Sequence, residues 1–208
     1  MISSVKKGLD NIVNLNENGI TLVYGPAGSG KTTVVKTALL SLLKYGKKAM
    51  LIDSRNNFSA ERFGQLAGPN YKNYLENIFL FKVNSFYDQH NKITEVIDFL
   101  DNINILTVDS IGHFYRKELS NDLYGTNKLM EMQIRCLNEA SKQIPVIIAN
   151  DVYTDLINNR ITMVASNIIE RWSSRIIELK NNPRIIKIHK PEIREAGFKI
   201  EEKGIFLV

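Results

Sequence analysis

The pattern G-x-x-x-x-G-K-S/T is matched at every position by Gly25-Pro26-Ala27-Gly28-Ser29-Gly30-Lys31-Thr32. The apolar run 20–24 stands directly before this stretch and indicates a buried strand, and residues 33–43 follow with apolar side chains at helical spacing. A strand, a glycine loop and a helix, in this order, are the setting that the pattern requires. Glycines let successive backbone N–H groups converge on a phosphate, and the helix N-terminus adds the positive end of its dipole. The stretch therefore predicts a phosphate-binding loop for a nucleoside triphosphate.

The expected ligands are ATP and Mg²⁺. Lys31 can reach the β- and γ-phosphates, and the Thr32 hydroxyl can ligate Mg²⁺. A second metal ligand usually follows a neighbouring apolar strand, and Asp109 follows the run 103–108. An aspartate that caps the next helix would look the same in sequence. The expected nucleotide-binding residues are those of the loop and the one after it: Gly25, Pro26, Ala27, Gly28, Ser29, Gly30, Lys31, Thr32 and Thr33.

Composition narrows the class of protein. The chain has 208 residues, 44% of them apolar and 24% charged, which is the balance of a single globular domain with its own core. One cysteine excludes an internal disulfide and a cysteine-based metal cluster. No apolar run reaches the roughly eighteen residues of a membrane span, and the N-terminus lacks a signal-peptide core, so we expect a cytoplasmic protein. The net charge of +5 favours an anionic partner, although a solvated basic face would give the same number.

Strand and helix patterns alternate through the first three quarters of the chain. Apolar runs that predict strands are followed by helical periodicity, and this alternation is typical of an α/β fold with a parallel sheet. Four short strand-like runs close the chain and predict an antiparallel extension at the sheet edge. The expected strands are 20–24, 47–53, 78–83, 103–108, 145–149, 175–179, 184–189, 197–200 and 205–208, and the expected helices are 33–43, 58–67, 88–101, 111–119 and 129–141.

These motifs together resemble the RecA/RadA recombinase superfamily, and most closely its archaeal RadB-like RadA paralogues. The likeness extends from about Gly8 to the C-terminus, and its most specific parts are 25–32, 52–63, 108–116, 145–153 and 171–179. The resemblance implies a RecA-like P-loop fold for one core domain, residues 1–208. Residues 1–19 would then be a lead-in segment, with no separate N-terminal DNA-binding domain.

The resemblance also implies roles by position. Arg62 would pack on the adenine, because a planar guanidinium can stack on a base, although a surface arginine on a helix would look the same. Asp151 holds the position at which the family usually has a γ-phosphate-sensing glutamine. Arg55 replaces the glutamate that acts on the attacking water, and arginine is always protonated, so it cannot be a general base. We therefore expect ATP binding with slow or absent hydrolysis, and no confident catalytic residue.

The DNA-contacting loop of the family corresponds to residues 154–165, which contain Asn158, Asn159 and Arg160. A disordered surface loop is the alternative for this segment. Further candidates for DNA contact are Lys187, His189 and Lys190, which the resemblance also places near a neighbouring subunit's nucleotide. The RadA recombinase polymerises through a phenylalanine ahead of its core, and residues 1–18 contain none, so a self-assembled filament is doubtful.

Three functions fit these features. The favoured one is an ATP-binding accessory that binds single-stranded, and secondarily double-stranded, DNA and modulates a RadA-type recombinase. The second is a weak DNA-stimulated ATPase that acts directly in strand exchange, against which Arg55 argues. The third is a signalling ATPase of the same fold that acts on protein, against which the basic charge balance argues. ATP turnover with and without DNA separates them, beside DNA binding at two salt concentrations.

Overall fold

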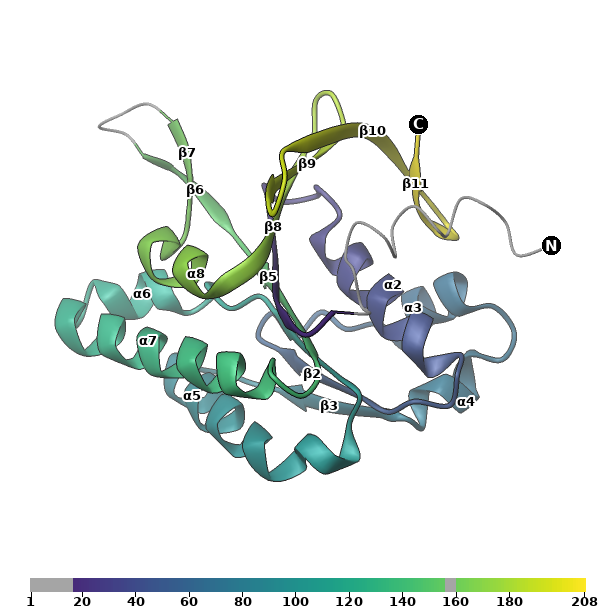
Figure 1. The fold of residues 1–208 in the computed structure, drawn as a ribbon, viewed down its shortest axis with the longest axis horizontal. Helices are drawn as coiled ribbons and strands as arrows, with labels where there is room; N and C mark the ends of the chain where they lie inside the picture. The colour runs from purple at the N-terminus through teal and green to yellow at the C-terminus, as the bar shows by residue number, and fades with distance from the viewer. Residues whose placement is uncertain (1–16, 156–159) are drawn as a thin grey trace.

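The fold is built on one large sheet, which the computed structural model describes within residues 17–155 and 160–208 (Figure 1). The order of its nine strands is β11-β10-β9-β8-β1-β5-β4-β2-β3. The strands are β1 (Gly19–Tyr24), β2 (Ala49–Asp53), β3 (Ile78–Lys82), β4 (Ile105–Asp109), β5 (Pro145–Asn150), β8 (Ser173–Lys180), β9 (Ile185–Lys190), β10 (Arg194–Glu201) and β11 (Gly204–Leu207).

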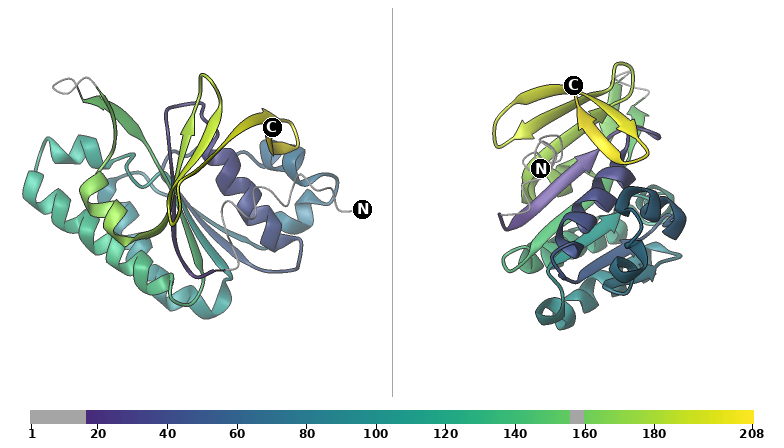
Figure 2. Two further views of the ribbon diagram at one scale, coloured as in Figure 1. Left: turned by 45° about the horizontal axis from the view of Figure 1, so that its top comes forward. Right: turned by 90° about the vertical axis from the view of Figure 1, so that its right-hand side faces the viewer.

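Six neighbouring strands, from β8 to β3, are parallel, and the last three are antiparallel. The α/β fold with a mostly parallel sheet and an antiparallel C-terminal extension is thus confirmed. The extension begins one strand later than expected, because β8 pairs in parallel with β1. Figure 2 shows the late strands continuing the sheet past β1 and curving over the N-terminal end of α2 (Lys31–Leu43).

Helices cover both faces of the parallel part, as Figures 1 and 2 show. One face carries α2, α3 (Ala60–Ala67) and α4 (Tyr71–Leu75). The other carries α5 (Phe86–Glu95), the 3-10 helix η1 (Val96–Asn102), α6 (Tyr115–Leu119), α7 (Leu123–Ala140) and α8 (Ser166–Trp172).

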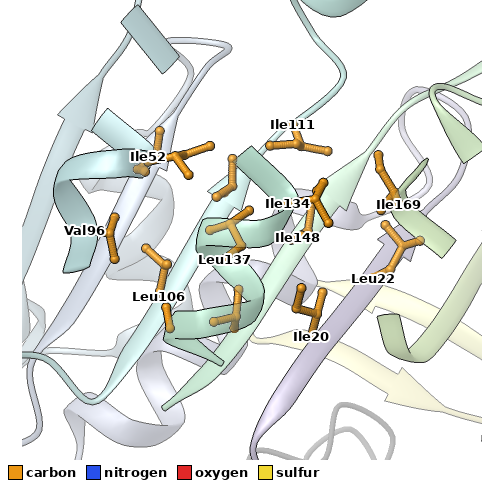
Figure 3. Close-up of a cluster of buried hydrophobic side chains, with 14 of the residues drawn as sticks. Ile20, Leu22, Ile52, Val96, Leu106, Ile111, Ile134, Leu137, Ile148 and Ile169 are labelled. Carbon is orange, nitrogen blue, oxygen red and sulfur yellow. The ribbon is translucent and has the colours of Figure 1, made fainter. Parts of the chain in front are cut away.

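Each face has its own hydrophobic core, because side chains alternate between the faces along each strand. In β4, Leu106 and Val108 pack with α5 and α7, whereas Ile105 packs with α2 on the other side. Figure 3 shows the larger core, in which Ile134 and Leu137 of α7 meet side chains from the central strands. Every residue of β4 is buried, as expected for a parallel strand covered on both faces. Among the described helices, none is long and apolar enough to cross a membrane.

Some elements differ from the sequence-based expectation. The segment 154–165, expected as a DNA-contacting loop, contributes to a two-stranded antiparallel hairpin of β6 (Val152–Asp155) and β7 (Arg160–Met163). The helix expected at 88–101 divides into α5 and η1. The helices α4 and α8 were not foreseen, since both are short.

The sheet order brings four carboxyl ends together. Tyr24 of β1 lies beside Asn150 of β5, and Asp109 of β4 lies between Ala149 and Asp53 of its neighbours. In open α/β sheets, ligands bind at this edge. The polar residues that end these strands are therefore placed around one point.

Candidate nucleotide-binding site

The phosphate loop connects β1 to α2 and turns at its glycines. Gly28 and Gly30 have φ values of 74° and 103°, a left-handed region that glycine enters without steric cost. Gly30 is the N-cap of α2 and provides no side-chain cap, so the first N–H groups of this helix are left for another acceptor. A helix start of this kind is a ready anion site.

The outer side of the loop is held by the turn between β8 and β9. Asn181 donates a hydrogen bond to the Ala27 carbonyl at 3.0 Å, and Arg184 donates one to the Gly28 carbonyl at 3.4 Å. These contacts hold two loop carbonyls against the turn between β8 and β9. The loop shape is therefore supported from outside by a segment more than 150 residues later in the chain.

A cavity of about 270 Å³ opens beside the loop. Part of its wall comes from Arg55 and Asn57, which follow β2, and part from Ile200 of β10. Sequence reasoning did not select Asn57 or Ile200, and for Ile200 no local signal exists, because only the curvature of the late strands brings it to the loop. The remaining lining residues belong to the loop and α2: Ala27, Gly28, Gly30, Lys31, Thr32 and Thr33.

Thr32 and Asp109, the two predicted Mg²⁺ ligands, are in direct contact. The Thr32 hydroxyl donates a hydrogen bond to Asp109 Oδ2 at 2.6 Å, and Asp109 Oδ1 is buried without a hydrogen-bond partner. Burial raises the pKa of the Asp109 carboxyl, and the Thr32 hydrogen bond partly opposes this. A buried carboxylate oxygen without a partner, next to a hydroxyl, suits a hard cation such as Mg²⁺. The described residues contain no cluster of three His, Cys, Asp or Glu for a metal, so Mg²⁺ would take its other ligands from water and phosphate.

Lys36 is a functional candidate that sequence reasoning missed. It lies one helical turn after Thr32, is 4% exposed, and has its Nζ 5.2 Å from the centre of the Phe58 ring. Burial lowers the pKa of Lys36, and the charges of Asp109 and Asp53 oppose that shift. A lysine on the same face of α2 as Thr32 was visible in the sequence, but its burial was not. It supplies a fixed positive charge near the two carboxylates.

A second charged group surrounds Asp151, which follows β5. Asp151 Oδ2 lies 2.6 Å from Arg55 Nη2 and accepts a hydrogen bond from Ser110 at 2.8 Å, and Oδ1 lies 3.4 Å from Lys31 Nζ. Burial would raise the pKa of Asp151, but the bonds to Arg55 and Ser110 outweigh it and hold that pKa below its usual value. Burial also lowers the pKa of Lys31, with Asp151 opposing. The structure thus joins Arg55 and Asp151, which the sequence could only consider separately.

Arg62, predicted to pack on adenine, lies on the exposed side of α3. Its guanidinium donates hydrogen bonds to the carbonyls of Glu201 and Glu202 and to the Gln65 side chain. It does not line the 270 Å³ cavity. In this arrangement Arg62 ties α3 to the turn between β10 and β11.

The candidates for DNA contact fall in two separate places. Arg160 opens β7, and Asn158 and Asn159 lie outside the described residues. Lys187, His189 and Lys190 lie on β9 instead. His189 is bonded to Tyr24 at 3.1 Å and to Glu178 at 3.0 Å, and Lys190 donates to the backbone carbonyls of Glu170 and Ser173.

A phosphate loop after β1, a buried carboxylate at the end of β4 and this order of strands define a RecA-like P-loop protein. The family model described as Rad51 matches residues 1–207, and this chain belongs to that family. DNA repair and recombination protein RadB of Methanococcus maripaludis is 31% identical over 206 residues, which cover 94% of each chain. The protein of the same name from Methanococcoides burtonii is 33% identical over 195 residues, covering 89% of this chain and 86% of that one. A crystal structure of the RadB recombinase is similar with a TM-score of 0.76 at 29% identity, covering 99% of this chain and 98% of that one.

Proposed function

We propose that this chain is an ATP-binding accessory of homologous recombination and DNA repair, which hydrolyses ATP slowly or not at all. The observation that carries the proposal is the wall of the nucleotide cavity. Arg55 lines it, and no described lining residue is acidic. Hydrolysis needs a group that orients or deprotonates water beside the γ-phosphate. A guanidinium cannot take that proton, although it can bind phosphate.

The carboxylates near the cavity are already engaged in other contacts. Asp53 accepts hydrogen bonds from the backbone N–H groups of Arg55 and Phe58. Asp109 is bonded to Thr32, and Asp151 is paired with Arg55. A carboxylate whose pKa is held low by an arginine is a weak proton acceptor, so Asp151 is a poor substitute base.

ATP and Mg²⁺ are the ligands that the site supports best. We propose that residues 25–33 hold the phosphates, that Thr32 and Asp109 hold Mg²⁺, and that Arg62 moves onto the adenine when nucleotide binds. Mg²⁺ would neutralise phosphate charge there.

The biological setting is proposed from the relatives. Proteins that align with this chain over nearly their whole length are named DNA repair and recombination proteins. We propose that residues 1–208 act as one core domain in the cytoplasm, binding single-stranded DNA and modulating a RadA-type recombinase without forming a filament of their own. Arg160, Asn158 and Asn159 are the proposed DNA contacts, with Lys187, His189 and Lys190 as secondary candidates.

Single-turnover ATP hydrolysis tests the slow-ATPase proposal. The proteins are the native chain, Arg55→Glu and the double variant Arg55→Glu with Asp151→Gln, each first confirmed to bind ATP. The double variant is needed because Arg55→Glu alone would set two carboxylates against each other at the Asp151 position. We expect the native rate to lie far below the order of 1 s⁻¹ of ordinary enzymes, and the double variant to be about 10²–10⁴-fold faster.

Lys31→Ala serves as the control for contaminating ATPase, because it removes the phosphate-binding lysine. Native turnover on the order of 1 s⁻¹ that Lys31→Ala abolishes would contradict the proposal and favour a motor that acts directly in strand exchange. If the double variant binds ATP but does not hydrolyse it faster than the native chain, the lack of a general base at position 55 does not explain the slow hydrolysis.

A further inference from the structure

The Asp151 carboxylate lies in surroundings that suit a phosphate oxygen. Lys31, Arg55 and the Ser110 hydroxyl all contact it, at 3.4, 2.6 and 2.8 Å. The Asp151 side chain is 17% exposed and that of Lys31 is 8% exposed, so these contacts are largely shielded from water. A lysine, a guanidinium and a hydroxyl are also the groups that proteins use to bind phosphate.

All three N–H donors of the Lys31 ammonium group already have an acceptor in this arrangement. Nζ lies 2.7 Å from the Gly25 carbonyl, 3.0 Å from the Pro26 carbonyl and 3.4 Å from Asp151 Oδ1. A phosphate oxygen that binds Lys31 must therefore displace one acceptor. The Asp151 contact is the longest of the three and joins Lys31 to a carboxylate, so it is the contact that an anionic phosphate oxygen would replace.

The Arg55 guanidinium is likewise already paired with Asp151, through Nη2. The same side chain lines the nucleotide cavity. The two cations and one carboxylate sum to a single positive charge at the place where phosphate would arrive. A phosphate that approaches Lys31 and Arg55 meets the negative charge of Asp151 beside them, and like charges are costly where water is largely excluded.

We propose that Asp151 stands in for the terminal phosphate in the nucleotide-free chain and competes with it for Lys31 and Arg55. The residue thereby reduces the preference of this site for a nucleoside triphosphate over a diphosphate. A diphosphate lacks the outermost phosphate, so it meets less of this competition. The inference rests on the proposed function, since it presumes that the site binds ATP.

Asp151→Asn is the direct test, because it removes the charge and keeps the size and an oxygen acceptor. Binding of ATP and of ADP, each with Mg²⁺, is measured by titration calorimetry for the native chain and the variant. We expect ATP affinity to rise at least about tenfold and ADP affinity less than about threefold, so that the ratio of the two increases. Asp101→Asn is the matched control. Asp101 is exposed on η1, before β4, and so lies at the opposite edge of the sheet from the nucleotide site.

Inorganic tripolyphosphate and pyrophosphate provide a second readout that does not depend on contacts to the adenine. The gain in Asp151→Asn should appear with tripolyphosphate and be smaller with pyrophosphate. Thermal unfolding of each protein without ligand checks that the variant is folded.

The outcomes separate the inference from the proposed function. An ATP-to-ADP affinity ratio that is unchanged or lower in a folded Asp151→Asn variant, while the native chain binds ATP, overturns the inference and leaves ATP binding intact. A lower ratio would mean that Asp151 orients Arg55 for phosphate rather than competing with it. If neither nucleotide binds the native chain or the two variants, the proposed function fails, and the inference fails with it.

Discussion

Asp109 offers a buried, unpaired oxygen to a metal ion, but the same burial favours the protonated carboxyl, which cannot bind the metal. It is 3% exposed, and its burial raises the pKa of the carboxyl above the ordinary 3.8. Mg²⁺ needs the ionised form, which is present above the raised pKa and is lost as the pH falls through it. Protons should therefore compete with Mg²⁺ at Asp109 at a higher pH than at an exposed aspartate.

We accordingly expect the Mg²⁺-dependent part of ATP affinity to fall as the pH is lowered, and to begin falling at a higher pH than an exposed aspartate would cause. The measurement is ATP binding with and without Mg²⁺ at several pH values. Asp109→Asn is the control, because the nucleotide phosphates also titrate and the variant reports their contribution alone. An identical pH dependence of the Mg²⁺ effect in the native chain and Asp109→Asn would exclude Asp109 as a metal ligand.

Single residues differ in how far the sequence could predict that they lie together. Lys31, Thr32 and Asp109 could be predicted because their motifs are local, and the structure brings all three together. The contact between Arg55 and Asp151 could not, because it depends on β2 and β5 lying on either side of β4. Ile200 is the extreme case, since it reaches the loop only through the curved late strands.

The position of the phosphate loop depends on its close packing against β8. A Cβ added at Gly25 would collide with the backbone carbonyl of Leu179, and a backbone atom in a sheet cannot easily move. We expect Gly25→Ala to lower the free energy of unfolding by roughly 1–3 kcal/mol through overpacking, and to weaken ATP binding by moving the loop. Denaturant unfolding and nucleotide titration measure the two effects.

Gly46→Ala is the matched control for that substitution. Gly46 has a φ of 70° and no atom within 4 Å of an added Cβ, so it reports only the backbone strain of a left-handed residue, about 1 kcal/mol. If Gly25→Ala costs no more stability than Gly46→Ala, the close contact with Leu179 does not constrain the loop.

The elements best predicted from sequence were those with long, uniform patterns. The strands β1, β4 and β5 are continuous apolar runs because both of their faces are buried, and such runs are easy to recognise. The hairpin of β6 and β7 was missed because its two strands are only four residues each and pair with each other rather than with the large sheet. Local periodicity likewise gives no sign that β8 would join β1 in parallel, since that pairing spans most of the chain.

Within the whole molecule, backbone and side-chain hydrogen bonds link the nucleotide site to the base of the hairpin. The Val164 N–H donates to the Asp151 carbonyl at 2.9 Å, and the Asn150 side chain donates to the Val164 carbonyl at 2.8 Å. The hairpin itself extends beyond α6 and α8, away from the sheet (Figure 1). Any movement of Asp151 on nucleotide binding would thus act at the base of the segment proposed to contact DNA.

Binding of single-stranded DNA tests that placement, with Arg160→Ala as the change on the hairpin. Loss of one phosphate contact should weaken binding to all sequences alike and reduce the slope of log affinity against log salt by about 0.7. Fluorescence anisotropy of a labelled oligonucleotide at several salt concentrations measures both. Arg194→Ala removes the same charge from β10, where Arg194 is exposed and paired with Glu192 at 2.6 Å. Arg194 belongs to the nine-stranded sheet, whereas the hairpin forms a two-stranded sheet of its own. Equal losses in the two variants would therefore mean that DNA responds to net charge and not to the hairpin.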